Sequence, residues 1–587
     1  MSVCIDRPIL SLDRPFTYGL DASIGAGVGS LVQVSFHGRA IRGWVLGPTD
    51  DLPKRMLPVK KTVGPIRCFD RDGLALASWV SERYVAPLAA VLGRATPPRV
   101  ASEEPKAPAL AGAPGPGAIT SALSTYRGVD ALFRSIAGPG FDAFTLRPAP
   151  EDEDLVVVEA VHAGLRAGRR ALVIVPEAKP IPGVARALAA AFGARCATLL
   201  GGSKRGRYRT WLDVQAGAFD VVVGSRPSVF APVPNLGLIV ISRESHPALR
   251  EDRAPYYHAR DVAMARGRIA GATVVLSSMS PSTETAALRL TSVTPTGRRW
   301  PPVEIVKPGF EGRAPRLVRA LGEAKRAFLF SPLPGYGIAA VCRSCGQPAA
   351  CAACGGLLRA EEGQVRCVVC EAEGRCKHCG AQDFGLRRGG RERVEEWAIR
   401  AASVPVKRLG PDDVPRLPKR GEILVGGPDD VRDFGRGGLD LVAILDADLA
   451  ERRPGLTARE RAVTTWMEAI AWARPDGRAI VQSSHASDPA VQALVRGNPD
   501  RFHADETRRR AEAGFPVGSA VFRIAGSPEL EGALAAFAPT TLLTSTVGDQ
   551  TVCLLALDPA RVPAFGRAVR ELAAREVVTR VEAEPHL

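Results

Sequence analysis

Residues 342–380 read CRSCGQPAACAACGGLLRAEEGQVRCVVCEAEGRCKHCG and hold eight of the chain's twelve cysteines. They form four Cys-x-x-Cys pairs: Cys342/Cys345, Cys351/Cys354, Cys367/Cys370 and Cys376/Cys379. A two-residue gap lets a tight turn direct two sulfurs at one tetrahedral metal, so four pairs predict two complete sites, which we assign to zinc. A redox dithiol and an iron–sulfur cluster are the alternatives. Four thiolates per zinc leave no open position, so the predicted sites are structural.

Spacing alone leaves the pairing of these cysteines open, because sequential sites and nested sites are both easy to build. We adopt the nested assignment. It places Cys342, Cys345, Cys376 and Cys379 on zinc 1, and Cys351, Cys354, Cys367 and Cys370 on zinc 2. Metal binding supplies about 10–16 kcal/mol of folding energy in small zinc domains, so this segment is expected to unfold on chelation.

Composition and charge place the chain among multidomain proteins that act in the cytoplasm. With 587 residues the chain is too long to fold around one compact core. No apolar run approaches the ~18 residues of a membrane-spanning helix. Charged residues from Asp6 to Arg14 interrupt any signal peptide. The formal net charge of +15 falls to about +11 if eight thiolates hold two zinc ions, and it favours a polyanionic partner such as DNA. An arginine-rich, GC-biased genome would explain the same excess.

The chain divides into stretches that differ in residue pattern and composition. Residues 1–100 alternate as in a small β-rich domain, and residues 101–140 are rich in proline and glycine, as in a linker. From 141 on, near-continuous apolar bursts separated by helical patterns predict two parallel sheets covered by helices. The first sheet spans 141–300; the second spans 301–341 and 381–485, interrupted by the 342–380 insert. Residues 486–587 follow a β-α-β-β-α-β order, which predicts a split-βαβ domain of the α+β class.

An eight-cysteine insert within the second of two α/β lobes resembles the family of primosomal protein N′, the PriA replication restart helicases. Further segments resemble the family in the same order: LDRPFTYGL (12–20), GRRALVIVPE (168–177), VVVGSRPSVFAPVPNLGLIVI (221–241), PYYHARDVAMAR (255–266), VVLSSMSPSTET (274–285), PGYGIAAVCRSCG (334–346) and AEAGFPVGS (511–519). The resemblance implies two RecA-like helicase lobes, a β-rich N-terminal domain that binds DNA 3′ ends, and a C-terminal domain. It also implies a winged helix, which residues 101–140 would hold only in reduced form or not at all.

The nucleotide motifs that the resemblance implies are replaced at three places. Counting back from 168–177, the family's Gly-Lys-Thr falls on Asp152, Glu153 and Asp154, whose carboxylates would repel a triphosphate. Glu244 in SRESH (242–246) stands where the family carries Asp-Glu-x-His. Arg474 remains from the family's Gly-Arg-Ala-Gly-Arg. We therefore predict a degenerate site with no catalytic residue and no ATP or Mg²⁺ bound in the family's manner.

The same acids also have a purely structural interpretation. Glu151 to Asp154 precede a helical pattern in which Leu155, Val158, Val161 and Leu165 recur. Acids in a first turn stabilise the helix dipole by about 0.3–1 kcal/mol each, so these residues would make a good helix start.

The resemblance further implies that the N-terminal domain recognises the 3′ end of a nascent strand through a Pro-Phe-Asp-Tyr motif. Here Phe16 would stack on the terminal base, a contact worth about 1–3 kcal/mol, and Thr17 replaces the aspartate. Gly38 matches a family glycine where the backbone approaches DNA. Lys60 and Lys61 are predicted phosphate contacts.

Three functions compete on these observations. The leading hypothesis is a scaffold that binds stalled, forked or branched DNA with a 3′ end and promotes primosome assembly and reloading of the replicative helicase, without unwinding DNA. Its expected partners are primosome proteins, the replicative helicase or its loader, and single-stranded DNA-binding protein; we expect a monomer and no membrane. The alternatives are an active ATP-dependent 3′-to-5′ helicase and a zinc-stabilised protein-interaction module without a DNA role. Fork binding separates the last hypothesis from the others, and nucleotide turnover separates the first two.

Overall fold

The structure is a computed structural model of the chain. It describes residues 1–54, 56–108, 121–297, 299–308, 313–331, 338–347, 349–353, 356, 358–361, 364–368, 370–387, 390–435, 437–450, 455–537 and 539–585. Within these ranges no helix has both the length and the apolar character needed to cross a bilayer.

The N-terminal domain is one mainly antiparallel sheet in the order β5-β2-β1-β4-β3-β6. Its strands are β1 (Ser2–Ile5), β2 (Phe16–Gly19), β3 (Ser30–Phe36), β4 (Arg39–Gly47), β5 (Leu57–Pro58) and β6 (Lys61–Arg67). Alternate side chains such as Val32 and Val34 meet Val3 and Val45 in a separate small core, as the period of two predicts. Helices α1 (Arg71–Arg83) and α2 (Leu88–Ala95) follow and connect this sheet to the next lobe.

Lobe 1 is built on an eight-stranded sheet in the order β10-β11-β9-β12-β13-β8-β14-β7, parallel except for the pair β14 and β7. Its strands are β7 (Tyr126–Arg127), β8 (Asp142–Leu146), β9 (Arg170–Ile174), β10 (Cys196–Leu199), β11 (Val221–Gly224), β12 (Leu236–Ser242), β13 (Thr273–Ser277) and β14 (Thr291–Pro295). Its helices are α3 (Val129–Ala137), α4 (Glu153–Arg166), α5 (Gly183–Phe192), α6 (Lys204–Gln215), α7 (Ala259–Ala270) and α8 (Thr283–Ala287). Every residue of β12 is buried, which explains why the sequence shows apolar bursts rather than alternation.

Lobe 2 carries a parallel sheet in the order β15-β24-β23-β16-β22-β21. Its strands are β15 (Val303–Val306), β16 (Arg326–Phe330), β21 (Val406–Arg408), β22 (Glu422–Gly426), β23 (Leu439–Ile444) and β24 (Ala473–Gln482). Its helices are α9 (Pro315–Glu323), α10 (Arg391–Ala401), α11 (Ala447–Ala450), α12 (Ala458–Ile470), α13 (Pro489–Arg496) and α14 (Asp500–Glu512). The predicted pair of parallel-sheet lobes is thus confirmed.

The cysteine-rich insert leaves lobe 2 after β16 and returns before α10. It forms an antiparallel sheet in the order β19-β18-β17-β20. Its strands are β17 (Ile338–Cys342), β18 (Leu358–Glu361), β19 (Gln364–Cys367) and β20 (Phe384–Arg387). The insert therefore extends beyond the predicted 342–380 on both sides, because β17 and β20 pair with each other and close its base.

The C-terminal domain is an antiparallel sheet in the order β26-β27-β25-β28 with two helices. Its elements are β25 (Ala520–Gly526), α15 (Leu530–Ala535), β26 (Thr541–Val547), β27 (Gln550–Leu557), α16 (Val562–Ala574) and β28 (Val578–Ala583). This is the predicted β-α-β-β-α-β order, with the first strand at the centre of the sheet.

Two further predicted boundaries differ from the structure. The expected linker 101–140 contains β7 and α3, which pack into the lobe 1 core through Tyr126, Leu132 and Ile136, so lobe 1 begins well before 141. Residues 109–120 of this linker lie outside the described ranges. The predicted C-terminal domain begins too early at 486, because α13 and α14 pack into the lobe 2 core through Leu494 and Phe502.

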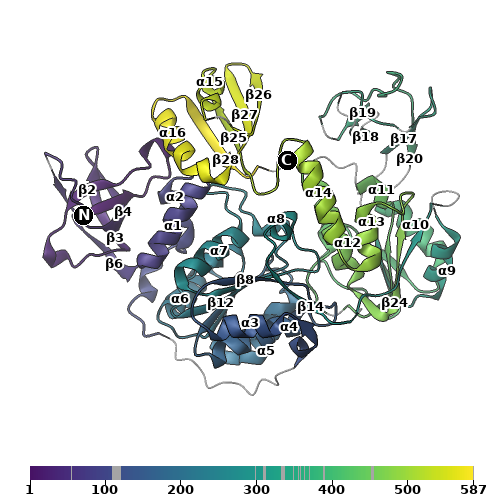
Figure 1. The fold of residues 1–587 in the computed structure, drawn as a ribbon, viewed down its shortest axis with the longest axis horizontal. Helices are drawn as coiled ribbons and strands as arrows, with labels where there is room; N and C mark the ends of the chain where they lie inside the picture. Colours follow the sequence, from purple (N-terminus) through teal and green to yellow (C-terminus); the bar gives the residue numbers. More distant parts are fainter. Residues whose placement is uncertain are drawn as a thin grey trace.

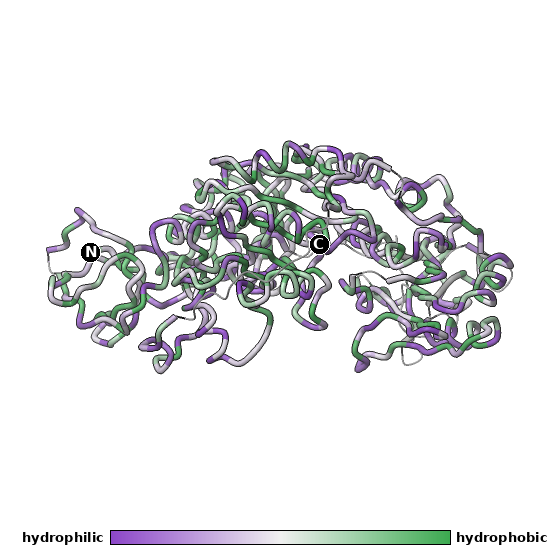
Figure 2. The backbone as a smooth tube through the Cα atoms, turned by 90° about the horizontal axis from the view of Figure 1, so that it is seen from below, coloured by the Kyte–Doolittle hydropathy of each residue, from purple (hydrophilic) through white to green (hydrophobic). Residues whose placement is uncertain are grey.

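The domains are arranged around lobe 1. Figure 1 shows the N-terminal sheet on one side of it, the C-terminal domain above it, and lobe 2 with the insert on the other side. Figure 2 shows the same elongated shape from below, with the N-terminal domain at one end. Three domains meet near the buried Tyr84 of α1: its hydroxyl lies 3.1 Å from Asp261 of α7, and the neighbouring Arg83 pairs with Glu584 of the C-terminal domain at 3.2 Å.

Candidate functional site

The first cysteine cluster joins the two ends of the insert. Four sulfur atoms lie within 4.8 Å of one another, those of Cys342, Cys345, Cys376 and Cys379. Each pair lies on a tight turn, because the N–H groups of Gly346 and Gly380 donate at 2.8 Å to the carbonyls of Cys342 and Cys376. Both glycines have positive φ, of 70° and 74°, which a residue with a Cβ adopts only with strain.

The second cluster lies beside the first. The sulfurs of Cys351, Cys367 and Cys370 also lie within 4.8 Å of one another, while Cys354, the predicted fourth ligand, lies outside the described residues. Cys351 forms a β-bridge with Cys376 of the first cluster, so the two groups adjoin. Among the described cysteines the grouping is nested: the two outer pairs lie together, and Cys351 lies with the pair Cys367/Cys370. The four gathered sulfurs of the first cluster are a donor set that fits a structural zinc ion, and the second cluster offers three described sulfurs of the same kind.

Of the four carboxylates at the expected phosphate site, Glu151 and Asp152 are held by the protein's own donors. They precede α4, at the carboxyl edge of the lobe 1 sheet. The Arg299 guanidinium bonds to Asp152 and lies 2.8 Å from Glu151, and the Tyr126 hydroxyl donates to Asp152 at 3.1 Å. Asp152 makes no capping hydrogen bond to the helix, so its carboxylate serves tertiary pairing rather than the predicted cap. Negative charge fixed in this way repels phosphate.

Glu153, where the family's lysine would stand, faces lobe 2. It lines an interlobe cavity of about 10 Å³ together with Arg243 and Glu468, which leaves room for about one water molecule. Burial raises the pKa of Glu153 well above its ordinary value, and the nearby Asp433 adds to the rise. A nucleoside triphosphate does not fit this space.

An ion pair between the lobes closes the same region. Arg243 directly follows β12, and its Nε donates to the Glu468 carboxylate of α12 at 2.8 Å. Nη2 of Arg243 donates to the other carboxylate oxygen, and both side chains are at most 9% exposed. Although burial acts to lower the pKa of Arg243, Glu468 outweighs it and the net shift is upward, so the guanidinium stays charged.

Glu244, which stands in place of the family's Asp-Glu-x-His, is not among the residues that line this cavity. It is fully buried, and its carboxylate accepts hydrogen bonds from the Ser282 N–H at 2.5 Å, the Ser282 hydroxyl at 3.0 Å and the Thr285 hydroxyl at 2.9 Å. Burial raises the pKa of Glu244, against the lowering effect of Arg260. Both carboxylate oxygens hold the start of α8, so this side chain acts as a structural anchor.

Arg474 is also separate from the interlobe cavity. It lies near the start of β24, where it pairs with Asp440 at 3.1 Å and Asp476 at 3.5 Å, and its side chain is half-exposed. The five predicted residues of the degenerate nucleotide site are therefore not brought together as one set.

A second interlobe cluster surrounds Arg510 of α14, which is 3% exposed. Its guanidinium lies 2.7 Å from Glu284 of lobe 1 and 3.2 Å from Glu506 of its own helix. It also bonds to Glu460 of α12 in lobe 2. One cation thus connects α8, α12 and α14 across the interface.

Phe16 lies at the rim of the N-terminal core. Its half-buried ring meets Phe36 edge-on, with centroids 5.2 Å apart, and the Arg14 guanidinium lies 5.3 Å from the Phe16 centroid. An aromatic pair beside a cation that has no acidic partner among the described residues suits a terminal base and its phosphate. Thr17 does not join them: Phe16 and Tyr18 both pack into the core, so strand alternation directs Thr17 to the opposite face.

The remaining predicted DNA contacts lie on the exposed side of the same sheet. His37 and Gly38 form the tight turn between β3 and β4, with φ of 46° and 77°, and a Cβ at Gly38 would meet nothing within 4 Å. Open space beside this backbone permits a close approach by a strand. Lys60 and Lys61 are exposed beside Gln33 of β3, at the start of β6.

Sequence reasoning missed Arg243, Glu468 and Arg510. Arg243 offered a weak signal, because it is a charged residue at the end of a fully apolar strand. Glu468 and Arg510 offered none, since charged residues on helices ordinarily face solvent.

Comparison with known proteins gives two kinds of match. Residues 2–97 match the family model described as the 3′ DNA-binding domain (3′BD) of PriA. The chain is 29% identical to the probable replication restart protein PriA of Mycobacterium leprae, covering 88% of this chain and 86% of the relative. It is 28% identical to the probable PriA of Mycobacterium tuberculosis, covering 96% and 92%. It is 27% identical to the PriA of Treponema pallidum, covering 86% and 83%.

The resemblance inferred from the sequence is confirmed by these matches. Among solved structures, a DExH-box NTPase HrpB of E. coli aligns with a TM-score of 0.34 at 11% identity, covering 65% of this chain and 44% of the other. A score this low supports no inference.

Proposed function

We propose that this relative of the PriA replication restart proteins acts in DNA replication restart by binding forked or branched DNA at a 3′ end. The observation that carries the proposal is the match of residues 2–97 to a 3′ DNA-binding domain, in a chain similar to restart proteins over most of its length. Phe16 is proposed to stack on the terminal base, with Gly38, Lys60 and Lys61 along the backbone. A DNA fork as partner implies work in the cytoplasm.

The protein performs this role without hydrolysing ATP. Acids stand where a phosphate-binding loop needs amides and a lysine, and the interlobe space is filled by the Arg243–Glu468 pair. Glu244 has both oxygens engaged in holding α8. These contacts support a protein in which the two lobes act as a structural scaffold.

The insert then serves as a surface for contact with DNA or protein. Two zinc ions, held by the nested cysteine sets, are proposed to fold it. The proposed partners are primosome proteins, the replicative helicase or its loader, and single-stranded DNA-binding protein, which a monomer would gather at the fork.

The test combines fork binding with ATP turnover. Zinc-replete protein is titrated against a fluorescent fork with a recessed 3′ end, and steady-state ATP hydrolysis is measured with and without saturating fork. The proposal expects tight fork binding and turnover no greater than that of Glu244→Gln and Arg243→Gln variants prepared alongside. Fork-stimulated turnover that these variants abolish would establish the alternative, an active helicase. Absence of fork binding would contradict the DNA role itself.

A further inference from the structure

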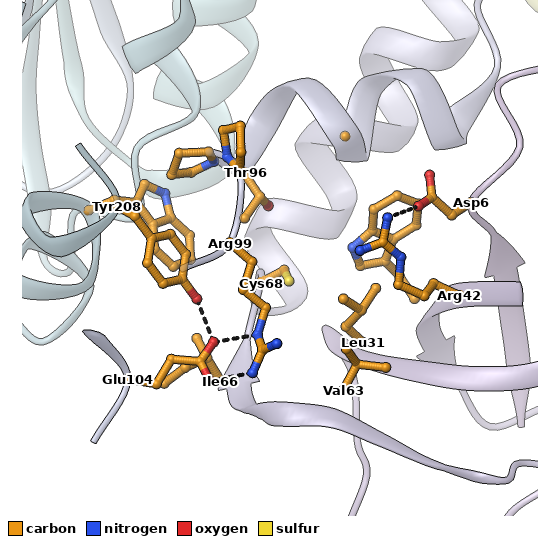
Figure 3. A pocket seen from close by; sticks show the side chains of 15 residues that line it. Asp6, Leu31, Arg42, Val63, Ile66, Cys68, Thr96, Arg99, Glu104 and Tyr208 are labelled. Carbon is orange, nitrogen blue, oxygen red and sulfur yellow. Dashed lines mark hydrogen bonds and ion pairs between the residues drawn. The ribbon is translucent and has the colours of Figure 1, made fainter. Parts of the chain in front are cut away.

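A cavity of about 250 Å³ lies where the N-terminal sheet, α2 and α6 of lobe 1 meet (Figure 3). It is several times the roughly 30 Å³ that one water occupies in the liquid, and it is just below the ~300–1,000 Å³ of pockets for drug-sized ligands. It therefore has room for a single ring system rather than a whole nucleotide. It is distinct from the Phe16 site, since neither Phe16 nor Phe36 lines it.

Aromatic rings form much of its wall. Tyr208 and Trp211 of α6 stack on each other with centroids 6.1 Å apart and planes 9° apart, and both line the cavity. Trp44 of β4 and Leu31 of β3 contribute further apolar surface. Flat apolar walls of this kind favour a planar ring over a compact polar ligand.

One polar group of a wall residue has no partner among the described residues. The Trp211 Nε1 atom is buried without a hydrogen bond, whereas the Thr96 side chain meets Cys68. A buried donor left unpaired costs about 1–3 kcal/mol, so each such group requires an explanation. A ring with acceptors on its edge, which every nucleobase has, would supply this partner once the indole edge turns toward the cavity.

Cations stand at the entrance. Figure 3 shows Arg42 with Asp6 on one side and Arg99 with Glu104 on the other. The Glu104 carboxylate accepts hydrogen bonds from Nε and Nη2 of Arg99, both at 2.6 Å, and from the Tyr208 hydroxyl at 2.8 Å. This side of the cavity is therefore held in place. The Arg42 side chain is 58% exposed, which leaves its charge available to a phosphate outside.

From this arrangement we infer that the cavity receives one unstacked base of single-stranded DNA, with the flanking phosphates beside Arg42 and Arg99. The inference rests on the proposed function and adds a second DNA subsite at the seam between the N-terminal domain and lobe 1. When Phe16 holds the 3′ end of one strand, the neighbouring unpaired strand would place a base in this cavity. The cavity would detect that a base is present without distinguishing which base it is.

Gly93 of α2 offers a direct test. It lines the cavity, and a Cβ built there meets nothing within 4 Å, so Gly93→Met fills the space without a clash and favours the helix. Gly532 of α15 is the matched control, since its Cβ also meets nothing within 4 Å and it lies in the C-terminal domain. Trp211→Phe provides a second variant, which removes the indole N–H and keeps an aromatic ring.

Binding is measured with a fork that carries a single-stranded oligo-dT arm and with the same fork carrying abasic residues in that arm. The wild type is expected to prefer the dT arm about tenfold, which Gly93→Met abolishes and Trp211→Phe weakens, while Gly532→Met keeps it. An unchanged preference in Gly93→Met, or competition by free dTMP as effective as that of the dT arm, would overturn the inference. A wild type that binds both forks without preference overturns this subsite alone, and one that binds neither overturns the proposed function.

Discussion

Arg243 of lobe 1 and Glu468 of lobe 2 form a two-point ion pair, with Nε at 2.8 Å from one carboxylate oxygen and both side chains at least nine-tenths buried. In a nucleotide-driven motor this boundary opens and closes around a triphosphate. Here a cation and an anion of the protein itself meet at this boundary, so the contact between the lobes does not depend on a bound nucleotide.

Removing one partner of this pair should destabilise the lobe interface strongly. Glu468→Ala leaves the Arg243 charge buried and unpaired, a change that typically costs about 3–5 kcal/mol. We expect calorimetry to show a clearly lower melting temperature. The double variant Arg243→Met/Glu468→Leu, which replaces both charges with apolar groups, should recover most of the loss.

The control for this prediction is the exposed pair Arg508–Glu512, whose side chains are 66% and 65% exposed. Glu512→Ala should change stability by no more than about 0.5 kcal/mol. Equal effects of Glu468→Ala and Glu512→Ala would show that the interlobe pair is not closed in solution.

The Arg510 cluster makes interface stability depend on pH. Burial, followed by the neighbouring Glu284, raises the pKa of Glu460 from 4.5 to about 7. A carboxyl whose pKa is higher in the folded state binds more protons there between these pH values, so its contribution to stability falls as pH rises from 4.5 to about 7. Glu460→Gln does not titrate, and its melting temperature relative to wild type should therefore increase between pH 5 and pH 8. A difference that stays constant or decreases over this range would contradict the assignment.

Zinc content should follow the nested cysteine sets. The wild type is expected to release two zinc ions per chain to a colorimetric chelator, and Cys342→Ser about one, because only the first cluster is lost. Chelation should render the insert sensitive to protease while the lobes remain intact. Cys196→Ser, at a cysteine outside the insert, is the control and should leave the zinc content at two; loss of both ions in Cys342→Ser would show that the clusters fold as one unit.

Phe16→Ala should weaken binding to a fork with a recessed 3′ end by about 5-fold to 150-fold, the range that follows from losing about 1–3 kcal/mol of base stacking. A fork whose 3′ end is blocked should show little difference between variant and wild type. Ile9→Ala, at another exposed apolar residue of the same domain, serves as the control. An equal loss on both forks would mean that Phe16 supports the fold rather than the terminal base.

The sequence predicted the elements whose environment is uniform. Near-continuous apolar runs such as Leu236–Ser242 could only be strands buried on both faces, and the cysteine pairs fixed the position of the insert. Helix α4 was harder. The expected face of Leu155, Val158, Val161 and Leu165 is displaced, because the most buried residues are Val156, Val157, Ala160, Val161 and Gly164. The consecutive apolar residues Leu155 to Val158 surround the helix, so periodicity alone could not decide which stripe faces the core.

Pairing across the lobes could not be predicted at all. Arg510 meets Glu284 and Glu460, which are far from it in sequence, and nothing local distinguishes it from the solvent-facing arginines of the same helix. For the same reason the four acids at 151–154 suggested a helix cap, whereas Arg299 from a distant segment determines the role of Asp152.

The Arg510 junction also bears on the distance between domains. Because one buried cation connects α8 of lobe 1 with α12 and α14 of lobe 2, it opposes movement of the N-terminal sheet and the insert toward each other. These two parts lie on opposite sides of lobe 1 (Figure 1). Under the proposed function, a fork held by both parts would be contacted at two points a set distance apart.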